Sequence, residues 1–174
     1  MRKLTHFCAS VVLLVMFLSV NAHSGDPVVP LVEIRADMAD VYEIPQEMAD
    51  QMINEMEGRI PSAGRVGVPV PAGARYLGGG RMQEMEYANL VSRDTPEAIQ
   101  AFYLGALDEM PGWQWCEKFD VFHRSDEPLT VQKLMSFTIP VIEIKELSSD
   151  DPMLITVDPD VKAALNTLFQ ITYR

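Results

Sequence analysis

Methionine is the residue type whose spacing first suggests chemistry in this chain. Met48, Met52 and Met56 recur every fourth residue, so a helix would place three thioethers on one face, and Met82 and Met85 form a second pair. Thioethers suit Cu(I). Methionine at helical spacing is also ordinary adaptable core material, and it suits surfaces that bind partners. The stripe leaves three alternatives open: docking on the chain's own sheet, contact with a partner or second copy, and copper handling.

Residues for nucleophilic catalysis are scarce. Beyond residue 22 the chain has His23, His123 and Cys116, and it lacks a Gly-x-Ser-x-Gly elbow. The run Gly78-Gly79-Gly80 is not followed by the Lys-Ser/Thr of a phosphate loop, so a flexible turn is expected there. The 25 acidic residues leave paired-carboxylate hydrolysis open. We expect a non-catalytic protein without a cofactor or metal.

The charge balance is strongly acidic. The formal net charge is −11 at pH 7, from 14 basic and 25 acidic residues. Such a surface repels phosphate backbones and anionic headgroups. The composition therefore predicts no nucleic-acid partner, and leaves a protein partner or self-association.

The first 22 residues resemble a secretory leader. Arg2 and Lys3 precede an apolar run from Phe7 to Val20, and Val20-Asn21-Ala22 gives the small-x-small pattern of a cleavage site. The apolar run is shorter than the roughly 20 residues of a membrane span. We expect a signal peptide over 1–22 and a periplasmic or secreted protein with no membrane anchor after cleavage.

Two segments precede the regular part of the chain. Residues 23–60 read as a loose arm that ends in a helix over Pro45 to Glu57, with Gly58 closing it. Residues 61–73 are rich in Pro and Gly, and are expected to form a linker or an extended wrap.

Residues 74–174 predict an α+β domain. Thr95 is a good N-cap, Pro96 suits the first helical turn, and apolar residues recur at spacings of three and four up to Met110. Period-two patterns predict strands over residues 84–92, 113–119, 121–124, 130–139, 141–147, 153–157 and 168–173, with a short helical turn from 158 to 165. The expected fold is an antiparallel sheet with the helix Thr95–Met110 on one face, plus the N-terminal Met-rich helix.

One combination of motifs resembles a known type of domain. It consists of Val70-Pro71-Ala72-Gly73-Ala74-Arg75, Thr95-Pro96-Glu97-Ala98-Ile99-Gln100-Ala101-Phe102-Tyr103 and Pro111-Gly112-Trp113. The combination resembles small exported bacterial domains of unknown function that have a P-x-G-A entry and a "TPE-x-I-x-x-FY … GW" helix signature. The resemblance covers roughly residues 69 to 113 and implies a compact α+β module without a catalytic constellation. It adds nothing on activity.

These observations favour an exported binding or protein-interaction module, with Met48, Met52 and Met56 as the partner-binding residues. The alternative is a periplasmic copper-handling protein that uses the same helix, and the third candidate is a carboxylate-based hydrolase. A binding module predicts a cleft or an apolar patch. Copper handling predicts accessible methionines, and an enzyme predicts two carboxylates, or His123 and an acid, facing each other.

Overall fold

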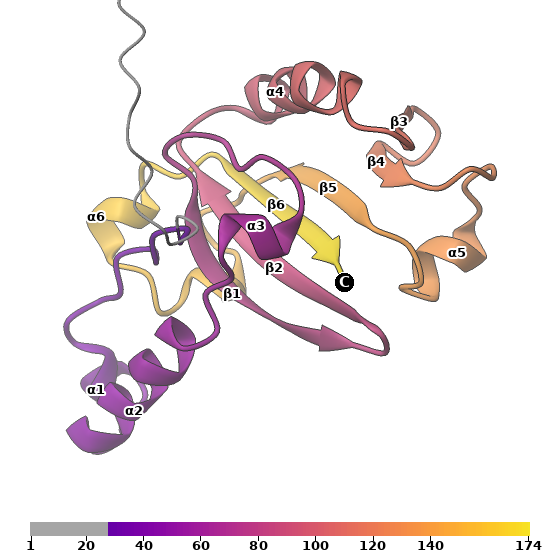
Figure 1. The fold of residues 1–174 in the computed structure, drawn as a ribbon. Coiled ribbons are helices and arrows are strands. Elements are labelled where there is room, and N and C mark those ends of the chain that lie inside the picture. Colours follow the sequence, from indigo (N-terminus) through magenta and orange to yellow (C-terminus); the bar gives the residue numbers. More distant parts are fainter. Residues whose placement is uncertain (1–27) are drawn as a thin grey trace, which may run out of the picture.

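The computed structural model describes residues 28–174, so the predicted signal peptide lies outside the described residues. They form one six-stranded antiparallel sheet with helices around it (Figure 1). The strands are β1 (Arg75–Met82), β2 (Met85–Ser92), β3 (Trp113–Cys116), β4 (Val121–Arg124), β5 (Val141–Glu146) and β6 (Thr167–Tyr173). The helical elements are α1 (Met38–Val41), α2 (Gln46–Glu57), α3 (Ala63–Val66), α4 (Pro96–Asp108), α5 (Val131–Met135), the 3-10 turn η1 (Pro152–Leu154) and α6 (Pro159–Lys162).

The order across the sheet is β1, β2, β6, β5, β4, β3, so β6 lies in the interior between β2 and β5. In β6 (Thr167–Tyr173), all residues except Gln170 are buried. A strand with neighbours on both edges and layers on both faces is expected to be almost wholly buried. The expected α+β class is therefore confirmed, as is the antiparallel sheet.

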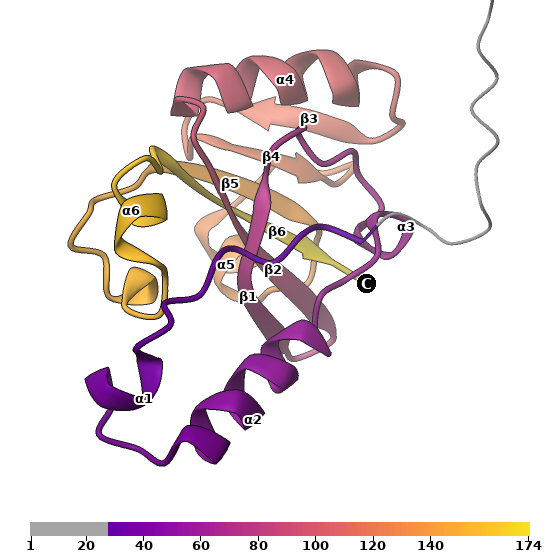
Figure 2. The same ribbon diagram turned by 90° about the vertical axis from the view of Figure 1, so that its left-hand side faces the viewer.

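Helix α4 covers one face of the sheet and builds the main core. Thr95 caps it by accepting a hydrogen bond from the backbone N–H of Ala98 at 3.3 Å. Ile99, Tyr103 and Leu107 are its buried residues, one turn apart on the side that faces the strands. This is the helix that the sequence predicts, and it lies across the sheet in both views (Figures 1 and 2).

The opposite face has two parts. Over β1, β2 and β6, a second core cluster packs η1, α6 and the segment around Val32 against the sheet. It consists of Val32, Leu77, Val91, Leu147, Leu154, Val157, Leu165 and Leu168. Over β4, β5 and the remainder of β6, the cover is α5 and the loops on either side of it. The two parts differ in packing, because α5 contributes no buried residue.

Two predicted strands are wrong. Residues 130–139 form α5 and a loop, because Thr130 accepts a hydrogen bond from the N–H of Lys133 and starts a helical turn. Residues 153–157 form η1 and a turn, where the Asp151 carboxylate caps the N–H of Met153 at 2.9 Å. In both segments, local side-chain caps on the backbone prevail over a period-two pattern.

The Gly78-Gly79-Gly80 run is not a turn, which corrects the sequence-based interpretation. It lies inside β1, where Gly79 pairs with Ala88 and Gly80 with Tyr87. A Cβ at Gly79 would press on the backbone of β2 and lie 2.7 Å from the Tyr76 hydroxyl. The missing side chains let tyrosines pack over the strand.

The Pro/Gly-rich segment 61–73 packs on the sheet and carries α3. Val66 and Val68 belong to the main core cluster together with Val29 of the arm. Of the two expected alternatives, a linker or an extended wrap, residues 61–73 therefore form the wrap. Helix α2 starts one residue after the predicted Pro45, which is its N-cap, and ends at Glu57 as predicted. It packs chiefly on α1, to the side of the sheet (Figure 2).

Candidate functional site

An apolar pocket of about 240 Å³ lies between α5 and the outer half of the sheet. Alternate residues of a strand face opposite sides. Phe122 and Ile142 therefore point into the core below α4, whereas Val121 and Val141 line the pocket. The complete lining is Phe119, Val121, Leu134, Met135, Phe137, Ile139, Val141, Glu143, Gln170 and Thr172.

Apolar side chains of α5 are left on the surface beside this pocket. Met135 is 70% exposed and Val131 is 60% exposed, and these are the largest exposed fractions among the exposed large hydrophobic residues of the described chain. Leu134 and Phe137 are half-buried at the pocket itself. The pocket is therefore the deep part of a wider apolar patch.

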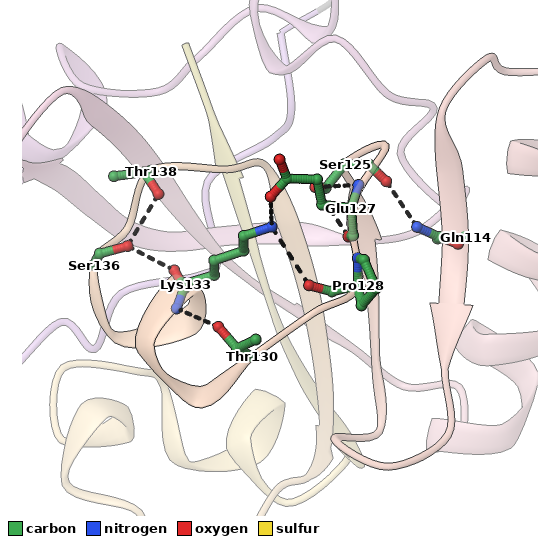
Figure 3. A network of polar contacts seen from close by, with 8 residues as sticks. All are labelled: Gln114, Ser125, Glu127, Pro128, Thr130, Lys133, Ser136 and Thr138. Atoms are coloured by element: carbon green, nitrogen blue, oxygen red, sulfur yellow. Dashed lines mark hydrogen bonds and ion pairs between the residues drawn. The ribbon is translucent and has the colours of Figure 1, made fainter.

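A polar network organises the α5 segment (Figure 3). Lys133 forms an ion pair of 2.5 Å with Glu127, and its ammonium also donates to the carbonyl of Pro128. Ser136 donates to the carbonyl of Lys133 at 2.9 Å and contacts the Thr138 hydroxyl at 3.0 Å. These bonds stay within residues 127–138, so the cover of the pocket is organised by its own segment.

Two residues at the pocket have unusual backbone conformations. Phe137, which lines the pocket, has a φ of 47°, and Asp120 between Phe119 and Val121 has a φ of 55°. Positive φ is uncommon for non-glycine residues and is costly for a bulky one. Such conformations gather at ligand clamps, where the surrounding structure maintains them. Asp120 lies in the turn between β3 and β4, where aspartate adopts positive φ at little cost, so Phe137 is the strained residue in the wall of the pocket.

His123 lies on the same face of β4 as Val121, opposite Val141 of β5. Its side chain is 3% exposed, and its Nδ1 atom has no hydrogen-bond partner among the described residues. Burial lowers the pKa of His123 below its ordinary value, and the positive charge of Lys133 lowers it further. The imidazole is consequently a neutral group beneath the α5 segment.

The methionines that the sequence predicts as partner-binding residues do not line this pocket. Met48 is 50% exposed and Met52 is 36% exposed on α2, while Met56 is half-buried. Docking of the stripe on the chain's own sheet, one of the three alternatives, therefore buries at most part of Met56. Exposure of the other two leaves both the partner-contact and the copper alternatives in place.

Within residues 28–174, the arrangement of acidic side chains and of histidine gives little support to the alternative of a carboxylate-based hydrolase. The carboxyl groups whose pKa values shift are Asp37, Glu97 and Glu127, and each is lowered by hydrogen bonds or a neighbouring cation. General acids of the paired-carboxylate type have raised pKa values. In the same residues no three His, Cys, Asp or Glu side chains gather closely enough to hold a metal ion.

Four aromatic residues between positions 113 and 122 are divided between the two faces of the sheet: Trp113, Trp115, Phe119 and Phe122. Trp113 and Trp115 pack against the main core, with Trp115 at 4.7 Å from Phe122 between ring centroids. Phe119 lies beyond the end of β3 and lines the pocket. The sequence does not predict the position of Phe119 in the pocket, because its period-two pattern extends the strand to Phe119 and favours another strand over residues 130–139.

No helix within residues 28–174 combines the length and the apolar composition that crossing a membrane requires. Comparison of the chain with protein-family models, with curated proteins and with solved structures found no match. The resemblance to small exported domains therefore stays a prediction.

Proposed function

We propose that this chain is a non-catalytic protein-interaction module, which receives an apolar anchor side chain of a partner protein in the pocket beneath α5. The observation that carries the proposal is the pocket itself, with Phe137 strained at its wall and Met135 70% exposed at its rim. Anchor pockets of this kind concentrate the binding energy of protein interfaces.

The size of the pocket favours a protein side chain over a whole small ligand. Its volume is about 240 Å³, whereas small-molecule sites enclose roughly 300–1,000 Å³. The apolar surface also continues beyond the pocket over Val131 and Met135. Charged groups accompany this apolar surface, because Glu143 lines the pocket and Lys133 of α5 is ion-paired with Glu127.

The methionine stripe is proposed as a secondary contact surface for the same kind of partner. Met48 and Met52 are exposed on a helix that packs little on the sheet. Copper binding by these thioethers remains the alternative. The leader-like residues 1–22 support a periplasmic or secreted location, where the partner would be found.

Site-specific photocrosslinking tests the proposal. We would place p-benzoylphenylalanine at position Met135 in cells that produce the full chain, and use Leu104, 52% exposed on α4, as the control position. The expected result is one adduct from Met135 that Leu104 does not give, with its crosslink on an apolar residue of the partner.

A second substitution connects the adduct to the pocket. Val141→Trp fills the pocket, and Leu104→Trp adds the same side chain elsewhere. Leu134→Gln, which makes the wall polar, repeats the test if Val141→Trp unfolds the protein. Loss of the Met135 adduct in the pocket variants alone supports the proposal. An adduct that persists in both pocket variants would overturn it.

A further inference from the structure

Five arginines line two adjoining clefts, and the larger cleft shares one lining residue, Ile139, with the apolar pocket. The larger cleft, about 620 Å³, has Arg65, Arg124 and Arg174 in its lining. The smaller cleft, about 430 Å³, has Arg59, Arg65 and Arg81. Arg65 belongs to both linings and so does Tyr173, so the two clefts meet at these residues.

This concentration of positive charge is unlike the rest of the chain, whose net charge is −11. Among the lining residues, the carboxylates are Glu86 and Asp126. Arg65 is paired with Glu86 at 2.6 Å, and Arg59 is paired at 3.6 Å with Glu55 of α2. The paired carboxylates neutralise only part of the charge.

The other three arginines have no carboxylate within ion-pair distance among residues 28–174. Arg81 donates to the backbone carbonyl of Gln83 at 3.2 Å, and Arg174 donates to that of Thr138 at 2.9 Å. A neutral carbonyl orients a guanidinium but does not cancel its charge. Arg81 is thus a cation without a paired carboxylate at the smaller cleft, and Arg124 is one at the larger cleft.

Neutral donors accompany the arginines. Trp113 also lines the larger cleft, but its Nε1 is buried and is not presented to the cleft. Tyr76 and Tyr173 line the smaller one. Burial raises the pKa of Tyr76 to about 12 and that of Tyr173 above its ordinary value, so both hydroxyls stay protonated at neutral pH. Guanidinium and hydroxyl groups donate hydrogen bonds, and oxyanions accept from them.

The glycines of β1 shape the smaller cleft. The Tyr76 hydroxyl lies against Gly79, and the ring of Tyr87 lies over Gly80 at 3.1–3.3 Å from where a Cβ would stand. The space beside Arg81 and Glu86 therefore depends on a strand without side chains at these two positions.

We propose that the paired clefts bind one small organic ligand that bears several oxyanion groups, carboxylate or phosphate, with Arg65 and Tyr173 between its charged ends. The acidic remainder of the surface repels a long polyanion, so the charge pattern fits a ligand no larger than the clefts. The arginine side chains lie outside the lining of the apolar pocket, and the two sites adjoin at Ile139, which lines both.

Calorimetric titration of the purified full chain tests the site at constant ionic strength. The probes are tripolyphosphate, butane-1,2,3,4-tetracarboxylate and inorganic phosphate. We expect one of the two multivalent probes to bind at least about tenfold more tightly than inorganic phosphate, because several guanidiniums contact one ligand. The tighter of the two identifies the ligand groups as phosphate or carboxylate. Failure of both multivalent probes to bind would overturn the proposal.

Matched charge variants separate a built site from general attraction. Arg124→Ala changes the larger cleft and Arg81→Ala the smaller, while Arg93→Ala removes the same charge from an exposed position outside both linings. Each cleft variant should weaken binding about tenfold, and Arg93→Ala less than twofold. An equal loss in all three means bulk electrostatics, and a loss in only one cleft variant means a single-cleft ion site. Either result overturns the proposal, and an unchanged thermal midpoint confirms that each variant is folded.

Discussion

His123, on the face of the sheet beneath α5, makes the stability of the protein depend on pH. The fold favours its neutral form, because burial and Lys133 both lower the pKa of the imidazole below the value of 6.5 that it has in an unfolded chain. The unfolded state consequently binds more protons in the window just below pH 6.5. The contribution of neutral His123 to the free energy of unfolding is fully present above pH 6.5. It is lost as the pH falls below 6.5 towards the pKa of His123 in the folded state.

We therefore predict that the free energy of unfolding falls between pH 7.5 and pH 5.5, and that His123→Leu abolishes most of this slope. Urea unfolding at the two pH values measures it. The carboxyl groups of Glu127 and Asp37 have pKa values lowered from 4.5 and 3.8, so they titrate below this range. A wild-type slope that survives in His123→Leu would contradict the assignment.

Tyr103 carries a hydroxyl that the core does not satisfy. The side chain is fully buried, its OH has no hydrogen-bond partner within residues 28–174, and burial raises the pKa of the hydroxyl. The ring itself packs well, with its centroid 5.1 Å from that of Phe102 and 6.2 Å from that of Phe169. The polar atom and the ring therefore have opposite effects on stability.

Removing the hydroxyl alone should stabilise the protein. We expect Tyr103→Phe to raise the free energy of unfolding by roughly 1 kcal/mol, since an unsatisfied buried hydroxyl costs about that much. Tyr103→Ala should lower it by about 3–5 kcal/mol, because a large cavity remains. Chemical denaturation distinguishes the two, and a destabilised Tyr103→Phe would mean that the hydroxyl does have a partner.

At the scale of elements, β1 depends on two neighbouring glycines in different ways. A Cβ at Gly79 would meet the carbonyl of Tyr87 and the Tyr76 hydroxyl, whereas a Cβ at Gly78 has nothing within 4 Å. Gly79→Ala should therefore lower the free energy of unfolding by about 1–3 kcal/mol. Gly78→Ala should leave it unchanged or raise it by about 0.4–1 kcal/mol, because alanine reduces the entropy of the unfolded chain. Thermal unfolding of the pair measures the difference, and equal effects would contradict the packing.

Helices α4 and α5 have the same kind of cap but different roles. Thr95 caps a helix with three buried residues, and Thr130 caps one with none. Thr95→Ala should lower the global free energy of unfolding by about 1 kcal/mol. Thr130→Ala should leave the global value nearly unchanged and instead speed hydrogen exchange of the α5 amides and weaken the Met135 crosslink. Equal global losses would show that α5 is part of the cooperative core.

The contrast between these helices also explains what the sequence could predict. In α4 the Thr95 cap, Pro96 and thirteen residues of apolar periodicity all agree. In α5 there are five residues, and the apolar positions from Val131 to Ile139 mimic a strand. The Thr130 cap was the available signal, but one local hydrogen bond weighs little against a pattern of that length.

At the scale of the whole molecule, neither site could be read from the chain. The apolar pocket combines Phe119, residues 134–139 and the β6 residues Gln170 and Thr172, which meet only because β6 pairs beside β5. The arginine clefts join residues from 59 to 174. Strand order determines both, and local propensity contains no information about strand order.

The interior place of β6 makes a further prediction about the complete fold. Without residues 167–174, β1 and β2 would share no strand pairing with β3, β4 and β5. We expect a chain that ends at residue 166 to show no cooperative unfolding transition, whereas removing Arg174 alone leaves it intact. Circular dichroism during heating measures this. A cooperative transition in the shorter chain would contradict the central role of β6.

The same strand order has a consequence for synthesis. β6 is the last of the described strands in chain order, yet it joins the two halves of the sheet. A chain emerging from the ribosome at about 5–20 residues per second cannot complete its sheet until residues 167–173 are exposed. Its topology delays folding until translation of these residues has finished.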